Sequence, residues 1–113
     1  MFGSVSFTAM TSALDALSMR QRVIAHNIAN VQTPGFQASR VAFEDALATA
    51  VRDGKGHVEP TVARSLEPTR EDGNNVNLDT EVLSNIDTGL RYQLATRAVE
   101  GTFTAVRTAM RTS

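Results

Sequence analysis

The side chains that could do chemistry in this chain are few, and their spacing does not favour catalysis or metal binding. His26 and His57 are the two histidines, and no carboxylate stands at a spacing that would complete a metal site with them. Glu44 and Asp45 are adjacent, so on a helix their side chains would diverge instead of forming an acid/base pair. The chain has no cysteine, which excludes thiolate metal sites and disulfides.

Two short segments fall short of known ligand-binding motifs. Gly54-Lys55-Gly56 lacks the spacing of a phosphate-binding loop. Asp72-Gly73-Asn74 lacks the spacing and the closing glutamate of a calcium loop. No serine, histidine and aspartate stand in an order that would place a nucleophile on a strained turn. We therefore expect no catalytic residue, no cofactor and no metal, and we expect that the protein is not an enzyme.

The composition limits the classes of partner. The chain has 113 residues, enough for one ordinary domain, and its net charge of −1 gives no electrostatic footprint for nucleic acid or anionic lipid. No apolar run approaches the roughly 20 residues of a membrane span, so we expect no direct membrane insertion. The start, Met1–Ser6, lacks a basic region and an apolar core, so we expect no cleaved secretory signal. The protein would then be cytosolic, or would leave the cell by a route that needs no such signal.

A long amphipathic pattern predicts a first helix from about residue 7 to about residue 31. Its apolar residues, with Gln21 included, follow one another in steps of three and four, which is typical of a coiled-coil seam. Ser6 is a suitable N-cap. The segment Thr33-Pro34-Gly35 should end the helix, because proline disfavours helical geometry before it and Gly35 can adopt a positive φ. The apolar positions are Phe7, Met10, Leu14, Leu17, Ile24, Ile28 and Val31.

The middle of the chain has weaker structural signals. Residues 43–51 are typical of a short amphipathic helix, with acidic residues at its start and Gly54 beyond its end. Val58 and Val62 would fit short extended pieces. The connection 53–76 is longer than compact domains usually contain, so we expect it to be mobile in isolation or ordered only by neighbours.

A second long helix is predicted from about residue 77 onward. Acidic residues concentrate in its first turns and arginines toward its end, which suits the helix dipole. Its apolar residues form two stripes, and a helix that is apolar on more than one side has more than one neighbour. One stripe is Leu83, Ile86, Leu90 and Leu94, continued by the small residues Ala98, Gly101 and Ala105; the other is Tyr92, Val99, Phe103, Val106 and Met110.

These patterns predict a mainly α fold. Long N- and C-terminal helices would pack as an antiparallel hairpin or coiled coil, with an irregular middle that contains a short helix and short strands. We divide this one structural domain into an N-terminal helix (1–32), a turn and connecting segment (33–76) and a C-terminal helix (77–113). The hairpin would leave Tyr92, Phe103 and Met110 partly uncovered, and an exposed apolar stripe marks an interaction surface.

One segment between the first helix and the middle resembles a known family. The run from Ala25 to Ala38 is similar to the N-terminal motif of bacterial flagellar rod, hook and hook-associated axial proteins: Asn-Ile-Ala-Asn, two variable residues, Thr-Pro-Gly and an aromatic residue. Asp72–Glu81, followed by Leu90-Arg91-Tyr92-Gln93, is similar to the basal-body rod members. The resemblance extends over residues 10–38 and 72–110. The positions that match the first motif are Asn27, Ile28, Ala29, Asn30, Thr33, Pro34, Gly35 and Phe36.

The resemblance implies a structural subunit of the proximal flagellar rod, which transmits torque through the cell envelope. Its partners would be other copies of itself, related rod proteins, the junction of basal-body ring and export gate, and the flagellar type III export apparatus. It would lie in the basal body, across the periplasmic space, after export without signal cleavage. The expected packing residues are Leu14, Leu17, Ile24, Ile28, Leu83, Ile86, Leu90, Tyr92, Leu94, Val99, Phe103, Val106 and Met110.

Physical reasoning supports assembly independently of the resemblance. Burying an apolar side chain contributes about 1.5–3 kcal/mol, whereas ordering a helical residue costs about 1 kcal/mol or more, so one seam inside one molecule would be marginal. We expect the Asn27 and Asn30 amides to hold the turn through Gly35. The alternative function, from another class, is a helical-hairpin adaptor or regulatory binding module that offers one apolar face to a single partner.

Overall fold

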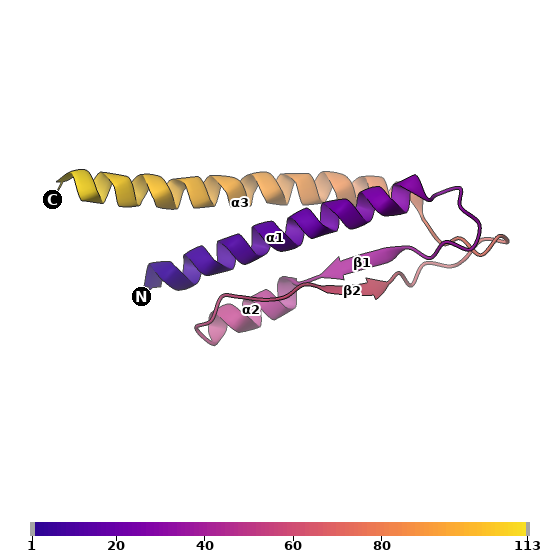
Figure 1. Ribbon diagram of the computed structural model, residues 1–113, viewed down its shortest axis with the longest axis horizontal. Coiled ribbons are helices and arrows are strands. Elements are labelled where there is room, and N and C mark those ends of the chain that lie inside the picture. The colour runs from indigo at the N-terminus through magenta and orange to yellow at the C-terminus, as the bar shows by residue number, and fades with distance from the viewer. Residues whose placement is uncertain (1, 113) are drawn as a thin grey trace.

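The computed structural model describes residues 2–112 and confirms a mainly helical chain built on two long terminal helices (Figure 1). α1 and α3 run antiparallel side by side, and they diverge toward the two chain termini, which lie at the same end of the molecule. The element order is α1 (Phe2–Ala29), β1 (Ser39–Ala42), α2 (Glu44–Arg52), β2 (Thr61–Arg64) and α3 (Leu78–Thr112).

The molecule is long and thin. Its principal extents are 66 × 25 × 14 Å, and its radius of gyration is 17.7 Å. A compact domain of this length would have a radius of gyration of about 13 Å. The shortest extent is close to the diameter of one helix with its side chains, roughly 10–12 Å. The elements therefore form one layer, and each of them keeps faces that no other part of the chain covers.

α1 is the central element of this layer, with α3 along one side and α2 and the two strands along the other (Figure 1). The prediction that α1 starts after Ser6 was wrong, since the helix already begins at Phe2. The extra turn has a partner inside the molecule, because Gly56 approaches the backbone of Val5 and Ala9. At the other end α1 stops at Ala29, and tighter turns with an i to i+3 hydrogen bond replace the helix, from Val31 to Ile28 and from Thr33 to Asn30.

The middle segment is more ordered than the sequence indicates. β1 and β2 pair antiparallel with Val41 opposite Val62, and α2 lies in the connection between them. Val62 is in a strand as expected, whereas Val58 is not. β1 gives little sequence signal because it has four residues and only Val41 is buried. The core of this region joins Ala16 and Leu17 of α1 to Phe43, with Leu47 of α2 and Ala95 of α3 packed against it.

α3 turns an unexpected side toward α1. Its buried or half-buried residues are mostly small or polar and recur at helical spacing: Glu81, Ser84, Thr88, Ala95, Val99 and Thr102. Thr88 is fully buried, and its hydroxyl has no hydrogen-bond partner among the described residues. At about 100° per residue, Leu83, Ile86, Leu90 and Leu94 point to the opposite side. This leucine stripe is 57–68% exposed, so the hairpin does not bury it.

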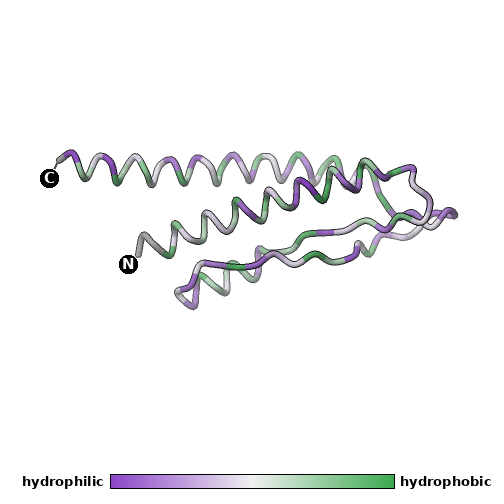
Figure 2. Tube along the Cα trace, viewed as in Figure 1, coloured by the Kyte–Doolittle hydropathy of each residue, from purple (hydrophilic) through white to green (hydrophobic). Residues whose placement is uncertain are grey.

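The second apolar stripe lies on the α1 side of α3 but is also poorly covered. Phe103 meets Phe7 edge to face, with ring centroids 5.5 Å apart, and yet remains 52% exposed. Val106 and Met110 are 51% and 73% exposed, because α1 diverges from α3 toward the termini (Figure 1). Figure 2 shows hydrophobic residues recurring along α3 up to its C-terminal end, well beyond the part that α1 covers.

Candidate assembly site

The family-like motif forms the turn at which the chain leaves α1, and its first asparagine is central to that turn. Asn27 is 1% exposed. Its amide donates to the Ser39 carbonyl at 2.9 Å and accepts from the Ser39 backbone N–H at 3.1 Å. The same amide donates to Glu81 Oε1 at 3.1 Å. Asn27 thus connects α1, the start of β1 and the first turn of α3, rather than the turn at Gly35 that we expected it to hold.

Asn30 acts more locally. Its amide donates to the His26 carbonyl and its Oδ1 accepts from the Thr33 hydroxyl at 3.0 Å. Pro34 and Gly35 follow on the exposed surface, and Gly35 has a φ of 75°, in the left-handed region that the motif predicts. Phe36 is half-buried and its ring lies 5.4 Å from that of His26. Of the other two motif residues, Ile28 is half-buried and Ala29 is exposed.

Asn74, from the second family-like segment, makes four hydrogen bonds with its side chain. Its amide nitrogen donates to the carbonyls of Asn30, Val31 and Thr33 at 2.9, 3.3 and 2.8 Å. Its Oδ1 accepts from the Val76 N–H at 2.7 Å. These three carbonyls belong to the tight turns that follow the end of α1 at Ala29. A side chain from 41 or more residues away therefore holds these turns in place, at 0% exposure.

Asn75 completes the connection on the strand side. Its Oδ1 accepts from the Ala38 N–H at 2.6 Å, and its amide donates to the carbonyls of Ser65 and Glu67. Nearby, the Gly35 N–H donates to the Asp72 carbonyl at 2.8 Å. We call Asn27, Asn74 and Asn75 the amide clasp. The sequence showed both segments, but nothing in their spacing indicated that they bind each other.

Glu81 lies at the edge of the amide clasp and is the only described acid whose pKa is clearly raised. Burial raises the pKa of Glu81, the hydrogen bond from Asn27 lowers it by less, and the charge of Glu67 adds to the increase. The ionised form of Glu81 is thus poorly stabilised within one molecule.

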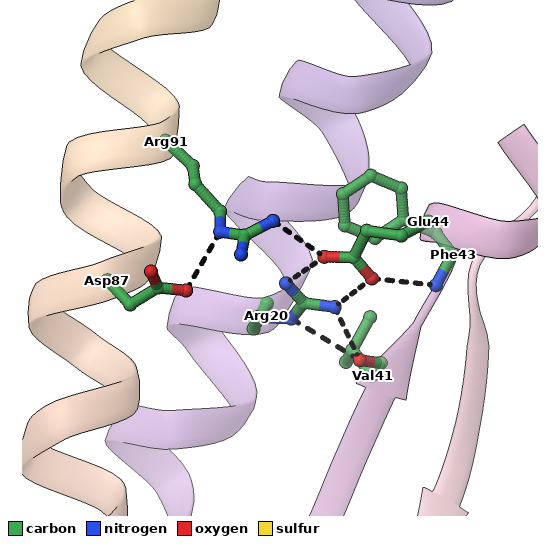
Figure 3. Close-up of polar contacts among 6 residues, drawn as sticks. All are labelled: Arg20, Val41, Phe43, Glu44, Asp87 and Arg91. Carbon is green, nitrogen blue, oxygen red and sulfur yellow. Dashed lines mark hydrogen bonds and ion pairs between the residues drawn. The ribbon is translucent and has the colours of Figure 1, made fainter. Parts of the chain in front are cut away.

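A second polar cluster fixes the middle segment to both long helices (Figure 3). Arg20 of α1 binds both carboxylate oxygens of Glu44 at 2.6 and 2.7 Å, and it donates to the Val41 carbonyl. Its guanidinium also lies 4.9 Å from the centre of the Phe43 ring. Arg91 of α3 reaches Glu44 at 3.6 Å. The bidentate pair orients the start of α2 against α1 at the level of the hydrophobic core.

We expect the Arg20–Glu44 pair to make stability fall in acid. The hydrogen bond from Arg20 lowers the pKa of Glu44 from 4.5 to about 2. Its contribution is therefore complete above pH 4.5 and is lost as the pH falls toward about 2. Because the Glu44 side chain is 41% exposed, solvent screening limits this contribution to about 1–2 kcal/mol. Thermal unfolding followed by circular dichroism should separate wild type from Glu44→Gln at pH 7, and the two should converge near pH 2. A constant difference across this range would contradict the assignment.

The loop after α2 binds the N-terminal turns of α1 through Gly56, which is buried and has a φ of 76°. A Cβ there would lie 2.7 Å from the Val5 carbonyl oxygen. Gly54 has a similar φ of 79° but nothing within 4 Å of the same position. The two glycines therefore have the same backbone conformation, but only Gly56 contacts α1.

Gly56→Ala should detach the loop, whereas Gly54→Ala should cost only the backbone strain of a positive φ, about 1 kcal/mol. We expect limited proteolysis at Lys55 to be at least about tenfold faster in Gly56→Ala than in Gly54→Ala, because the first variant also loses its contact with α1. Equal cleavage rates would show that the contact with α1 contributes nothing.

Ser12, His57 and Glu59 lie together, an arrangement the sequence did not predict. Ser12 Oγ is 3.4 Å from His57 Nδ1, and His57 Nε2 is 3.0 Å from Glu59 Oε1. The geometry does not favour a nucleophile. Ser12 is 5% exposed in the middle of a helix, and its Oγ also accepts from the Val58 N–H at 3.4 Å. These contacts fix the loop to α1 alongside Gly56.

The predicted packing residues divide into two groups. On α1, Leu17 and Ile24 are buried, and Leu14 and Ile28 are half-buried. On α3 only Val99 is half-buried, and the remaining predicted positions are exposed. The residues available to a neighbouring molecule are thus concentrated on α3: Leu83, Ile86, Leu90, Tyr92, Leu94, Phe103, Val106 and Met110.

The described residues contain neither a candidate metal site nor a candidate membrane span. Among residues 2–112, no group of three or more His, Cys, Asp or Glu side chains could hold a metal ion. Within the same range, neither long helix has an apolar stretch sufficient to cross a membrane.

The chain is similar to one family of known proteins over most of its length. The family described as "Flagella basal body rod protein" matches residues 8–37, which include α1 from Thr8 onward and the turn after it. The chain is 35% identical to the flagellar basal body rod protein FlgB of Borrelia hermsii, over 74% of this chain and 78% of the relative. The FlgB proteins of Escherichia coli K12 and Bacillus subtilis 168 are 34% and 27% identical, over 79% and 89% of this chain and 80% and 89% of the relatives.

Proposed function

Because this chain belongs to the family of flagellar basal-body rod proteins, we propose that it is a subunit of the proximal rod that assembles through its terminal helices and transmits torque through the cell envelope. Its membership makes it a structural component of the flagellar basal body, with a role in motility.

The exposure of α3 is the observation that carries this proposal. Leu83, Ile86, Leu90 and Leu94 form an apolar stripe that is more than half exposed over three helical turns. Soluble monomers rarely leave so continuous an apolar surface uncovered. A tube of parallel helices would cover it with the helices of neighbouring subunits, and a layer one helix thick can be covered in this way on both faces.

The three parts of the chain have separate roles in this proposal. Residues 1–32 and 77–113 supply the packing helices. Residues 33–76 supply the turn, the strands and α2, which hold the helices in register. The partners are other copies, related rod proteins, the junction of ring and export gate, and the type III export apparatus that would deliver the chain without signal cleavage.

A deletion strain tests this function directly. Cells that lack the chain should lose the rod and motility, and a plasmid copy should restore both. Isolated basal bodies from complemented cells should contain the chain at its full length. Cells that swim normally without the chain would contradict a structural role in the rod.

A further inference from the structure

Two segments at opposite ends of the molecule carry opposite net charge. Residues 64–81, at the turn end, contain five acidic residues and two arginines. Residues 97–112, at the C-terminal end of α3, contain Arg97, Arg107 and Arg111 against one acid, Glu100. None of these three arginine side chains has an ion-pair or hydrogen-bond partner among the described residues, and each is exposed. In a body 66 Å long, this distribution favours contact between unlike ends of two copies.

The acidic end contains a groove with an apolar floor. It has a volume of about 550 Å³ and lies between α1, β1, the segment after β2 and the first turns of α3. Ile24 and Val41, 4% and 7% exposed, form its apolar part. Leu66 lines it as well, although this side chain is 89% exposed. An apolar side chain so exposed beside a groove would gain from an apolar partner.

Glu67 and Glu81 give this groove its charge. Both line it, and Glu67 raises the pKa of Glu81 in addition to the effect of burial. Arg20 also lines it but is bound to Glu44. Arg40, an exposed residue, is the remaining cation of the lining. Neither Glu67 nor Glu81 forms an ion pair with a described residue. A cation from another molecule would therefore stabilise both carboxylates.

The C-terminal end of α3 has the complementary chemistry. Val106 and Met110 lie one helical turn apart on one face, with Arg107 and Arg111 beside them. Residues 81 and 107 are separated by about 39 Å of helix, so these arginines cannot reach Glu81 of their own molecule. We propose that the C-terminal turns of α3 of one copy dock in this groove of a second copy, with Val106 and Met110 against Leu66 and with Arg107 or Arg111 facing Glu67 and Glu81.

This head-to-tail contact rests on the proposed rod function and specifies one of its interfaces. Because the groove and the C-terminal turns are different surfaces, the contact is heterologous, and it propagates into a row of subunits instead of closing as a dimer. Each copy still leaves its leucine stripe exposed for lateral neighbours.

The test uses the absence of natural cysteine in the chain. Leu66→Cys and Val106→Cys proteins are purified separately, mixed at increasing concentration and oxidised. We expect a mixed disulfide dimer between one copy of each variant. Leu66→Cys mixed with Ala48→Cys, whose new thiol lies on the exposed side of α2, is the matched control and should give at least about tenfold less dimer. Equal yields in the two mixtures would overturn the proposal, as would mixed dimers in neither.

Charge exchange provides an independent readout. Arg107→Glu combined with Arg111→Glu should lower the association constant, measured by sedimentation at low salt, by about tenfold or more. Glu67→Arg in the partner should restore association. Arg52→Glu combined with Arg40→Glu makes the same change in net charge without touching the C-terminal turns; because Arg40 lines the groove, this pair should leave association intact or strengthen it. A loss as large as that of the first pair would overturn the contact.

The proposed function and this contact can fail separately. If the Arg107→Glu, Arg111→Glu protein restores normal rods and motility to the deletion strain, the head-to-tail contact is wrong and the rod function stands. If even the wild-type chain is dispensable for the rod, the proposed function is wrong, whatever the disulfide experiment gives.

Discussion

Replacing Asn74 by alanine should open the turn end of the molecule and prevent rod assembly. The side chain is 0% exposed and satisfies three carbonyls and one N–H of the backbone. Removing it leaves the Val76 N–H without its acceptor, at a cost of about 1–3 kcal/mol, partly relieved by water that enters. Each of the three carbonyls loses one hydrogen bond, at about 0.5–1.5 kcal/mol, and keeps a second donor from Thr33, Arg70 or Phe36. We expect a total of about 3–4 kcal/mol, at the upper end of single substitutions.

Hydrogen exchange at two backbone groups measures this effect. The Gly35 N–H binds the Asp72 carbonyl and the Ala38 N–H binds Asn75, so neither loses its own acceptor in Asn74→Ala. Both should nevertheless exchange about two to three orders of magnitude faster, because the whole turn opens together. Asn85→Ala, on the exposed surface of α3, is the matched control and should change neither rate. Unchanged exchange in Asn74→Ala would show that the amide clasp does not hold the turn.

Leu90→Asp should abolish assembly and leave the subunit itself intact. Leu90 is 58% exposed at the centre of the leucine stripe, so a carboxylate there remains solvated in the isolated molecule. In an assembled rod the same carboxylate would be buried against apolar neighbours without a cation, at a cost of several kcal/mol, and the burial of the leucine, about 1.5–3 kcal/mol, would be lost. Circular dichroism of the monomer should be unchanged, whereas cells should lack rods.

Asn85→Asp is the matched control for this prediction. It places the same charge five residues away on the same helix, about 140° around the axis from Leu90 and at an exposed position. We expect near-normal motility from Asn85→Asp and none from Leu90→Asp. If both variants swim, the leucine stripe is not an assembly surface. If both monomers lose helix, the effect acts on folding instead.

The helices were predictable because their signals are local. Each of these signals involves residues close in sequence: the apolar spacing, the acidic start of α3 and the helix stop at Thr33-Pro34-Gly35. Both long helices lie within a few residues of the predicted limits. The early start of α1 was missed because its extra turn gains a distant partner, Gly56.

The partners of the asparagines could not be predicted from the sequence. Asn74 binds residues 41 to 44 positions earlier, and Asn27 binds Glu81, 54 positions later. Helical spacing placed Asn27 and Asn30 on one face but did not indicate what that face meets. The two motifs were visible as separate segments, and the fold explains them as two halves of one connection.

The orientation of α3 was the other part that periodicity left open. Both stripes of α3 have helical spacing, and the pattern does not indicate which of them faces α1. The fold turns small and polar residues such as Ser84, Thr88 and Ala95 inward and leaves the leucine stripe outward. A subunit that kept its best apolar surface for itself would be a stabler monomer. This one leaves that surface exposed, as the proposed assembly through α3 requires.

The reactivity of one introduced thiol tests most directly whether neighbouring subunits cover the leucine stripe. Leu94 is 65% exposed in the single molecule. The natural chain has no cysteine, so a cysteine introduced at this position is its only thiol. We expect Leu94→Cys to react readily with a maleimide in dilute protein, to be protected in isolated basal bodies and to become reactive again when those basal bodies are dissociated in acid. Equally fast labelling in intact basal bodies and in dilute protein would contradict it.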